Sequence, residues 1–72
     1  MKVYAILMEI SEENGWFGTL VDFRYECEEH GLEVDELNEE YAVVCDEYGD
    51  EECIVYFGGT ASTITIRRIV EA

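Results

Sequence analysis

Carboxylates are the side chains in this sequence most able to do chemistry, and they are concentrated in the middle of the chain. Between Glu26 and Glu52 no Lys or Arg interrupts them, and His30 is the one residue there that can carry a positive charge. Like charges at this density repel one another, which destabilises a compact fold and favours contact with a cationic partner. The thirteen carboxylates of this stretch are Glu26, Glu28, Glu29, Glu33, Asp35, Glu36, Glu39, Glu40, Asp46, Glu47, Asp50, Glu51 and Glu52.

One His and three Cys are the other candidates for chemistry. Cys27 and His30 lie three residues apart, so a Cys–His pair for nucleophilic catalysis can be imagined. The surrounding negative charge raises the pKa of a thiol and disfavours the reactive thiolate. A cationic imidazole before Gly31 would instead stabilise the C-terminus of a helix. The sequence contains no Ser–His–Asp set, Gly-rich phosphate loop or HExxH motif, so we expect a protein that is not an enzyme.

The same residues are weak candidates for metal ligands. Cys27, Cys45, Cys53 and His30 could supply four zinc ligands, but the close pairwise spacing of zinc sites is missing. The acids of residues 46–52 lack the DxDxDG order of a dedicated calcium loop. We therefore expect no metal and no cofactor, and reduced, partly buried thiols.

Composition indicates one folded, strongly acidic domain. Seventy-two residues suit a single domain, which buries only about 60% of its unfolded surface. Hydrophobic residues make up 49% of the chain, too many for a disordered acidic tail. Eighteen acids against four bases leave a net charge of −14, so neither bare nucleic acid nor an anionic membrane is an expected partner. The N-terminal apolar run resembles neither a signal peptide nor a membrane span, which favours a cytoplasmic location.

The first element is predicted to be a strand over residues 2–10. Val3, Ala5 and Leu7 alternate with Tyr4, Ile6 and Met8, so both faces are apolar, as in a central strand covered on both sides.

Residues 16–30 are predicted to form a helix. Its apolar stripe consists of Trp16, Leu20, Phe23, Cys27 and His30. Gly31 follows as a natural residue to end the helix, with Leu32 behind it. A strand is the alternative, because residues 21–27 also alternate between apolar and polar, but the length and the Gly31 stop favour the helix.

The second half of the chain is predicted to be mostly β-structure. Residues 32–40 are expected to be a loop or a single helical turn, and residues 41–57 a hairpin about Gly49. In that hairpin Cys45 would lie opposite Cys53, Val43 opposite Val55 and Tyr41 opposite Phe57. Gly58, Gly59 and Thr60 predict a turn, and residues 62–70 a last strand whose pattern shifts at Arg68. The predicted fold class is α+β, in the order β-α-β-β-β: a small antiparallel sheet of about four strands with one helix on one face.

The density of charge suggests mimicry of a polyanion. A domain of this length spans roughly 30 Å. Duplex DNA carries about seventeen charges over that length, which is comparable to −14. In size, acidity and compact α+β pattern the whole chain resembles the small inhibitors that phages make against host nucleic-acid enzymes, a class that includes anti-CRISPR proteins, anti-restriction proteins and uracil-DNA glycosylase inhibitors. The resemblance does not depend on a shared motif. It implies that the chain is a phage protein that acts in the host cytoplasm.

The predicted function is that of a non-catalytic inhibitor whose acidic surface blocks the basic nucleic-acid-binding site of a larger protein. The predicted partner-binding residues lie on the outer helix face, at the hairpin tip and at two neighbouring tyrosines: Asp22, Glu26, Glu29 and Glu33; Asp46, Glu47, Asp50, Glu51 and Glu52; Tyr25 and Tyr48. The alternative is an acidic adaptor or subunit that docks through an exposed sheet edge, with its charge serving solubility.

Overall fold

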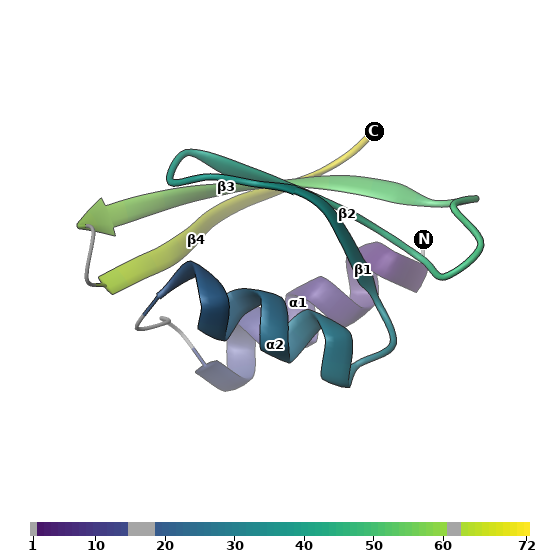
Figure 1. The fold of residues 1–72 in the computed structure, drawn as a ribbon, viewed down its shortest axis with the longest axis horizontal. Helices are drawn as coiled ribbons and strands as arrows, with labels where there is room; N and C mark the ends of the chain where they lie inside the picture. The colour runs from purple at the N-terminus through teal and green to yellow at the C-terminus, as the bar shows by residue number, and fades with distance from the viewer. Residues whose placement is uncertain (1, 15–18, 61–62) are drawn as a thin grey trace.

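The computed structural model describes residues 2–14, 19–60 and 63–72, in which two helices precede four strands (Figure 1). The elements are α1 (Lys2–Asn14), α2 (Leu20–Glu29), β1 (Glu33–Leu37), β2 (Tyr41–Cys45), β3 (Glu52–Thr60) and β4 (Thr63–Glu71). The strands form one antiparallel sheet in the order β1-β2-β3-β4, and both helices lie against the same face of it. The α+β class and the four-stranded antiparallel sheet are thus confirmed, whereas the order β-α-β-β-β and the single helix are wrong.

The predicted first strand is the helix α1. Val3, Leu7 and Ile10 are fully buried and step by four and three residues, which is the spacing of one helix face. Ala5 and Met8, which a strand would place among the covered residues, are exposed instead. An apolar run of this length fits either period, and packing decides: α1 lies against β4 and β3 on the inner face of the sheet.

The helix α2 confirms the predicted second element within residues 20–29 and excludes the strand alternative there. Thr19 and Asp22 form a capping box, in which each side chain accepts a hydrogen bond from the other residue's backbone N–H, at 3.2 Å and 3.0 Å. The helix ends at Glu29, and Gly31 follows the His30 cap as predicted, with a φ of 79° that favours glycine. The backbone N–H of Leu32 donates to the carbonyl of Cys27, which completes the cap. Trp16, at the start of the predicted stripe, lies outside the described residues.

The strand β1 occupies the stretch predicted to be a loop. Val34 and Leu37 pack against the core, and an extra residue between Val34 and Glu36 shifts the register with β2. That irregularity breaks the alternation of Glu33–Leu37 in the sequence, which is why the pattern did not resemble a strand. β1 is an edge strand of only five residues with three acids, two features that protect edges from unwanted pairing.

The hairpin of β2 and β3 is confirmed, but its predicted register is wrong by one residue. Val44 lies opposite Cys53, and Cys45 lies opposite Glu52. A shift of one residue changes which side chains share a face, so the buried Val55 lies opposite Ala42 rather than opposite Val43. The loop accounts for the difference, because it runs from residue 46 to residue 51 and centres the hairpin between Tyr48 and Gly49 rather than on Gly49.

The predicted turn at Gly58, Gly59 and Thr60 is also wrong, since all three residues belong to β3. Gly59 has a φ of 107° and leaves no room for a Cβ beside the backbone of Thr63, so only glycine fits there. The last strand is confirmed, and the shift noticed at Arg68 is a bulge: β4 contains an extra residue between the partners of Tyr56 and Phe57.

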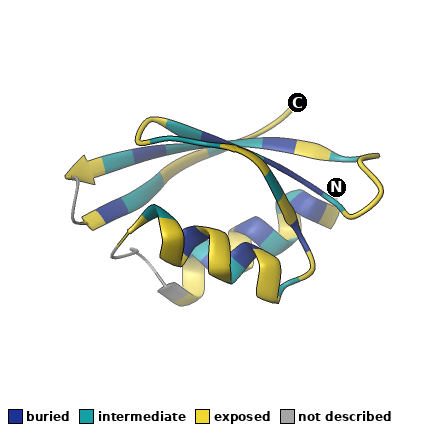
Figure 2. Cartoon of the chain, in the orientation of Figure 1, coloured by how far each residue is buried: buried dark blue, intermediate teal, exposed yellow. Residues whose placement is uncertain are grey.

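The core is a single apolar layer between the helices and the inner face of the sheet (Figure 2). The rings of Phe23 from α2 and Phe57 from β3 meet edge to face, with their centroids 4.9 Å apart. Within residues 2–13, 19–60 and 63–72 no charged or polar side chain is buried. Each Asp and Glu in this part of the chain is therefore exposed or half-buried, which suits a protein with a net charge of −14.

Replacement of a buried α1 residue tests the helical assignment. We expect Leu7→Ala to lower the free energy of unfolding by about 2–5 kcal/mol, because Leu7 is fully buried. Met8→Ala is the matched control, since Met8 is 38% exposed and should change little. Urea unfolding followed by circular dichroism provides both values, and a larger loss for Met8→Ala would contradict the assignment.

Candidate functional site

The acids of α2 form an exposed face, although not the complete stripe that was predicted. Asp22 and Glu29 are exposed, while Glu26 is half-buried. Glu33 lies in β1 rather than on the helix. Tyr25 is 59% exposed, and the adjacent Glu29 carboxylate raises its pKa through hydrogen bonding and charge. The structure thus brings Tyr25 and Glu29 together on one helix face and assigns Asp22 to the cap of the same helix.

The loop at residues 46–51 uses two of its acids to hold its own shape. The Asp46 carboxylate accepts hydrogen bonds from the backbone N–H groups of Asp50, at 2.8 Å, and Glu51, at 3.3 Å. The Glu51 carboxylate in turn accepts from the backbone N–H of Val3, at 3.1 Å. It therefore supplies an anionic partner to the free N–H groups at the start of α1.

The remaining predicted residues of this loop are free of such roles in the described part of the chain. Glu47 and Asp50 are exposed, and Tyr48 is 78% exposed, the most exposed large apolar residue there. Glu52 is exposed at the start of β3, beside Cys45. The predicted tip is therefore a mixed surface, in which Asp46 and Glu51 are structural and the others face solvent.

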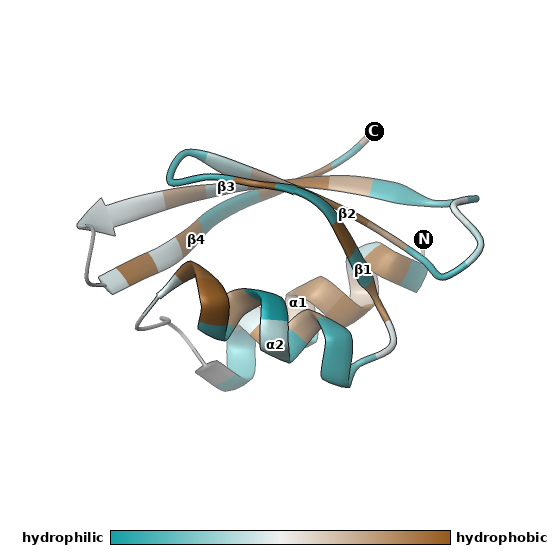
Figure 3. Cartoon of the chain, viewed as in Figure 1, coloured by the Kyte–Doolittle hydropathy of each residue, from teal (hydrophilic) through white to brown (hydrophobic). Residues whose placement is uncertain are grey.

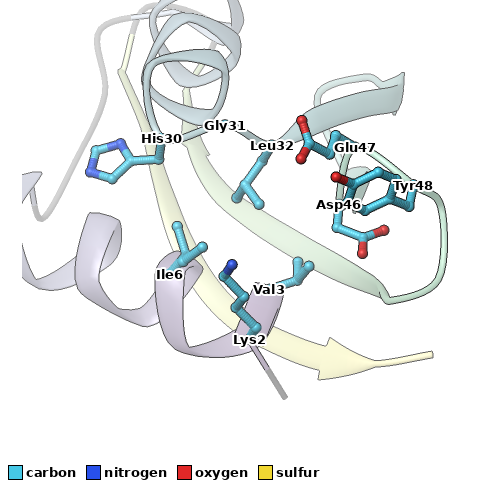
Figure 4. A pocket seen from close by; sticks show the side chains of 9 residues that line it. All are labelled: Lys2, Val3, Ile6, His30, Gly31, Leu32, Asp46, Glu47 and Tyr48. Atoms are coloured by element: carbon cyan, nitrogen blue, oxygen red, sulfur yellow. The ribbon is translucent and has the colours of Figure 1, made fainter.

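A hollow of about 270 Å³ lies between this loop and the start of α1 (Figure 4). The Lys2 side chain points into the hollow between Ile6 and Leu32, and Asp46 and Glu47 line its other side (Figure 4). The ring of His30 turns away from these acids, and its Nδ1 donates to the Glu26 carbonyl at 2.9 Å. His30 thus occupies the cap position at the end of α2 that the sequence suggested.

The three thiols are buried and separated. Cys27 and Cys53 lie in the core, whereas Cys45 lies on the other face of the sheet, so the predicted pairing of Cys45 with Cys53 is wrong. Burial, with help from the charges of Glu26 and Glu28, raises the pKa of Cys27 to about 12. At neutral pH its thiol is protonated and is a poor nucleophile.

Cys45 lies beside two carboxylates of β1. Its thiol donates to Asp35 at 3.5 Å, and the possible ligand atoms of Glu33, Asp35 and Cys45 lie within 4.8 Å of one another. Burial, followed by that hydrogen bond and the nearby acids, raises the pKa of Cys45 to about 11. A metal at this cluster would therefore have to displace a tightly held proton. Sequence reasoning missed the cluster because residues 32–40 were assigned to a loop.

The outer face of the sheet is the surface that sequence reasoning missed most completely. The helices cover the inner face, and no other element within the described residues covers the outer one (Figure 1). On its two central strands, Tyr41 lies opposite Tyr56 and Val43 lies opposite Ile54, and all four are half-buried. The sequence does contain a signal for this surface, because the residues on both faces of β2 and β3 are apolar. The predicted pairing of the two strands was wrong by one residue, so it did not group the outward-facing residues together.

Comparison with known proteins adds no relationship: no family model matches the chain, and no curated protein or solved structure is significantly similar to it. None of the helices in the described ranges is long and apolar enough to cross a membrane.

The structural role of Glu51 is open to a direct test. We expect Glu51→Ala to lower the free energy of unfolding by about 0.5–2 kcal/mol, because it removes the anionic partner of the α1 N-terminus. Asp50→Ala changes the net charge equally but leaves that contact intact, so it serves as the control. Equal stabilities of the two variants in urea would contradict the capping role.

The thiol of Cys27 should make the protein sensitive to alkali. Its pKa is raised from 9.0 to about 12, so the unfolded chain releases a proton that the folded state still holds. The resulting contribution to stability is complete below pH 9 and is lost as pH rises toward 12. We expect the decline in the free energy of unfolding above pH 9 to be shallower in Cys27→Ala than in the wild type. Parallel pH profiles from urea unfolding would contradict this.

Proposed function

We propose that this protein is a non-catalytic inhibitor that blocks the basic nucleic-acid-binding site of a larger protein. The observation that supports this most is the density of fixed negative charge. The described residues occupy 31 × 20 × 18 Å and the chain has a net charge of −14. Duplex DNA carries about 18 charges over 31 Å, so a basic channel would meet a comparable number on this domain.

The placement of the carboxylates also supports the proposal. They project from ordered elements, namely the exposed faces of α1 and α2, the strand β1 and a loop fixed by its own hydrogen bonds. An array that is already ordered loses less conformational entropy when it binds than a flexible acidic tail would. The proposed partner is therefore a protein with clustered Lys and Arg, and the proposed location is the cytoplasm of a host cell.

An adaptor that docks through a sheet edge is a second candidate. The edge strand β4 has nine residues and carries Arg67 and Arg68, so it is longer and less acidic than the edge strand β1. A long edge of this kind is able to pair with an added strand. In that case the charge serves solubility, and nucleic acid has no effect on binding.

Competition with nucleic acid distinguishes the two candidates. The test uses a panel of purified DNA glycosylases, restriction endonucleases and CRISPR nucleases, with binding measured by calorimetry. We expect at least one member to bind with an affinity that falls steeply between about 50 and 500 mM salt, because screening weakens contacts between charges. Duplex DNA should then compete for the same site. Formation of a ternary complex with unchanged affinities would contradict mimicry.

A further inference from the structure

The outer face of the sheet combines three properties. It is broad, because it spans all four strands. Its centre contains Val43, Ile54 and two tyrosines, and charged residues lie at its margin. Figure 3 shows the hydrophobic residues of the central strands β2 and β3 along the ribbon. In an antiparallel sheet with one covered face, the solvent-facing positions are normally polar. Apolar side chains at those positions in the two central strands are therefore unusual and mark a surface for contact with another molecule.

Strand pairing places the apolar side chains next to one another. Val43 lies opposite Ile54, which lies opposite Val70 on β4. In the next row on the same face, Tyr41 lies opposite Tyr56, over whose ring the Arg68 guanidinium sits at 4.7 Å from the centroid. We call these residues the outer patch: Tyr41, Val43, Ile54, Tyr56 and Val70.

Carboxylates border the outer patch on its β1 side. Glu36 lies opposite Val43, and Glu33 lies opposite Cys45, whose other neighbour is Glu52. Asp35 belongs to the same margin, because its carboxylate accepts from the thiol of Cys45. The four acids that make up this border are Glu33, Asp35, Glu36 and Glu52, and all are exposed.

The charges decide between the molecules that could cover such a surface. A second copy of the chain would bring another −14 and another acidic border to the contact, which opposes self-association. A basic surface with an apolar centre matches the row of Val43 and Ile54 and the acidic border, while the Arg68 guanidinium stays over the Tyr56 ring on the β4 side. Protein interfaces have the same anatomy, with an apolar, aromatic core and a charged rim.

We propose that the outer patch and its acidic border are the docking surface for the basic protein partner, with Val43, Ile54 and Tyr56 at the centre of the contact. This proposal rests on the proposed function in taking the partner to be basic, and it goes further by assigning the contact to one face. The acids of α2 and of the loop at residues 46–51 then contribute long-range attraction. Three of them, Asp22, Asp46 and Glu51, already serve hydrogen bonds within the fold.

The first experiment uses two synthetic peptides as probes. One is a helix-forming peptide of about 18 residues with Leu on one face and Lys and Arg on the other, about five turns long. The other has the same composition in scrambled order, so that charge is matched and the apolar face is lost. We expect the amphipathic peptide to bind about tenfold more tightly, with NMR shift changes in ¹⁵N-labelled protein concentrated at β2 and β3.

Matched variants then test the patch itself. Ile54→Thr keeps a β-branched residue in the strand and removes apolar surface, so it should weaken the amphipathic peptide about tenfold without unfolding the sheet. Val21→Thr is the control, because Val21 is 73% exposed on α2 and should have no effect. For the border, Glu33→Gln with Glu36→Gln should weaken binding at low salt more than Glu12→Gln with Glu13→Gln on α1.

Several outcomes would overturn the proposal. They are equal binding of the two peptides, no saturable binding of either, shift changes confined to the helices or to the loop at residues 46–51, and no difference between Ile54→Thr and Val21→Thr. A dimer in sedimentation that Ile54→Thr dissociates would show that a second copy covers the face, and would also overturn it.

The experiments also test the docking surface and the proposed inhibitory function independently of each other. If an enzyme of the panel binds in competition with DNA but Ile54→Thr leaves that affinity unchanged, the docking surface is wrong and the inhibitor remains. If the peptide docks on the outer patch but nucleic acid competes for no partner, the surface is right and the inhibitor is wrong.

Discussion

The need to keep eighteen carboxylates in water shapes this small protein. A buried, unpaired carboxylate is so unfavourable that none of the described ones lies inside, and the core has to be built from the apolar residues alone. In a chain of this length those residues suffice for one layer, which the two helices and one sheet face share. The contact of Phe23 with Phe57 joins the helical half of that layer to the strand half.

Several acids also hold the structure together, which reduces the apparent excess of charge. Asp22 helps to cap α2, Asp46 fixes the loop before β3, and Glu51 reaches back to the first turn of α1. In each case a carboxylate satisfies backbone N–H groups that would otherwise lack a partner. Negative charge near a helix N-terminus is stabilising, so Asp22 and Glu51 offset part of the repulsion that the remaining acids create.

The asymmetry of the sheet connects the fold to the proposed activity. The inner face is covered by α1 and α2, and the outer face presents tyrosines and β-branched residues next to the acids of β1. Charge draws a basic partner toward the domain over a long range, but it does so from every side. Apolar contact is short-ranged and local, so in the proposed complex the patch around Ile54 selects one orientation.

The sequence by itself determined the features that depend on local chemistry. The end of α2 at Gly31, the hairpin of residues 41–57 and the irregularity near Arg68 were all predictable, because a positive φ, a turn region and a break in alternation each leave a local signal. The sequence also predicts the net negative charge and the surface position of the carboxylates.

Tertiary structure alone decided the rest. Residues 2–10 are apolar enough for a strand or a helix, and only the need to cover one face of the sheet makes them α1. The bulge in β1 interrupts the alternation of this edge strand, so the sequence predicted a loop there. The six-residue loop between β2 and β3 sets the register of these two strands, which no local pattern encodes. That register turns Tyr41, Val43, Ile54 and Tyr56 outward together, so the surface proposed for docking exists only once the sheet is assembled.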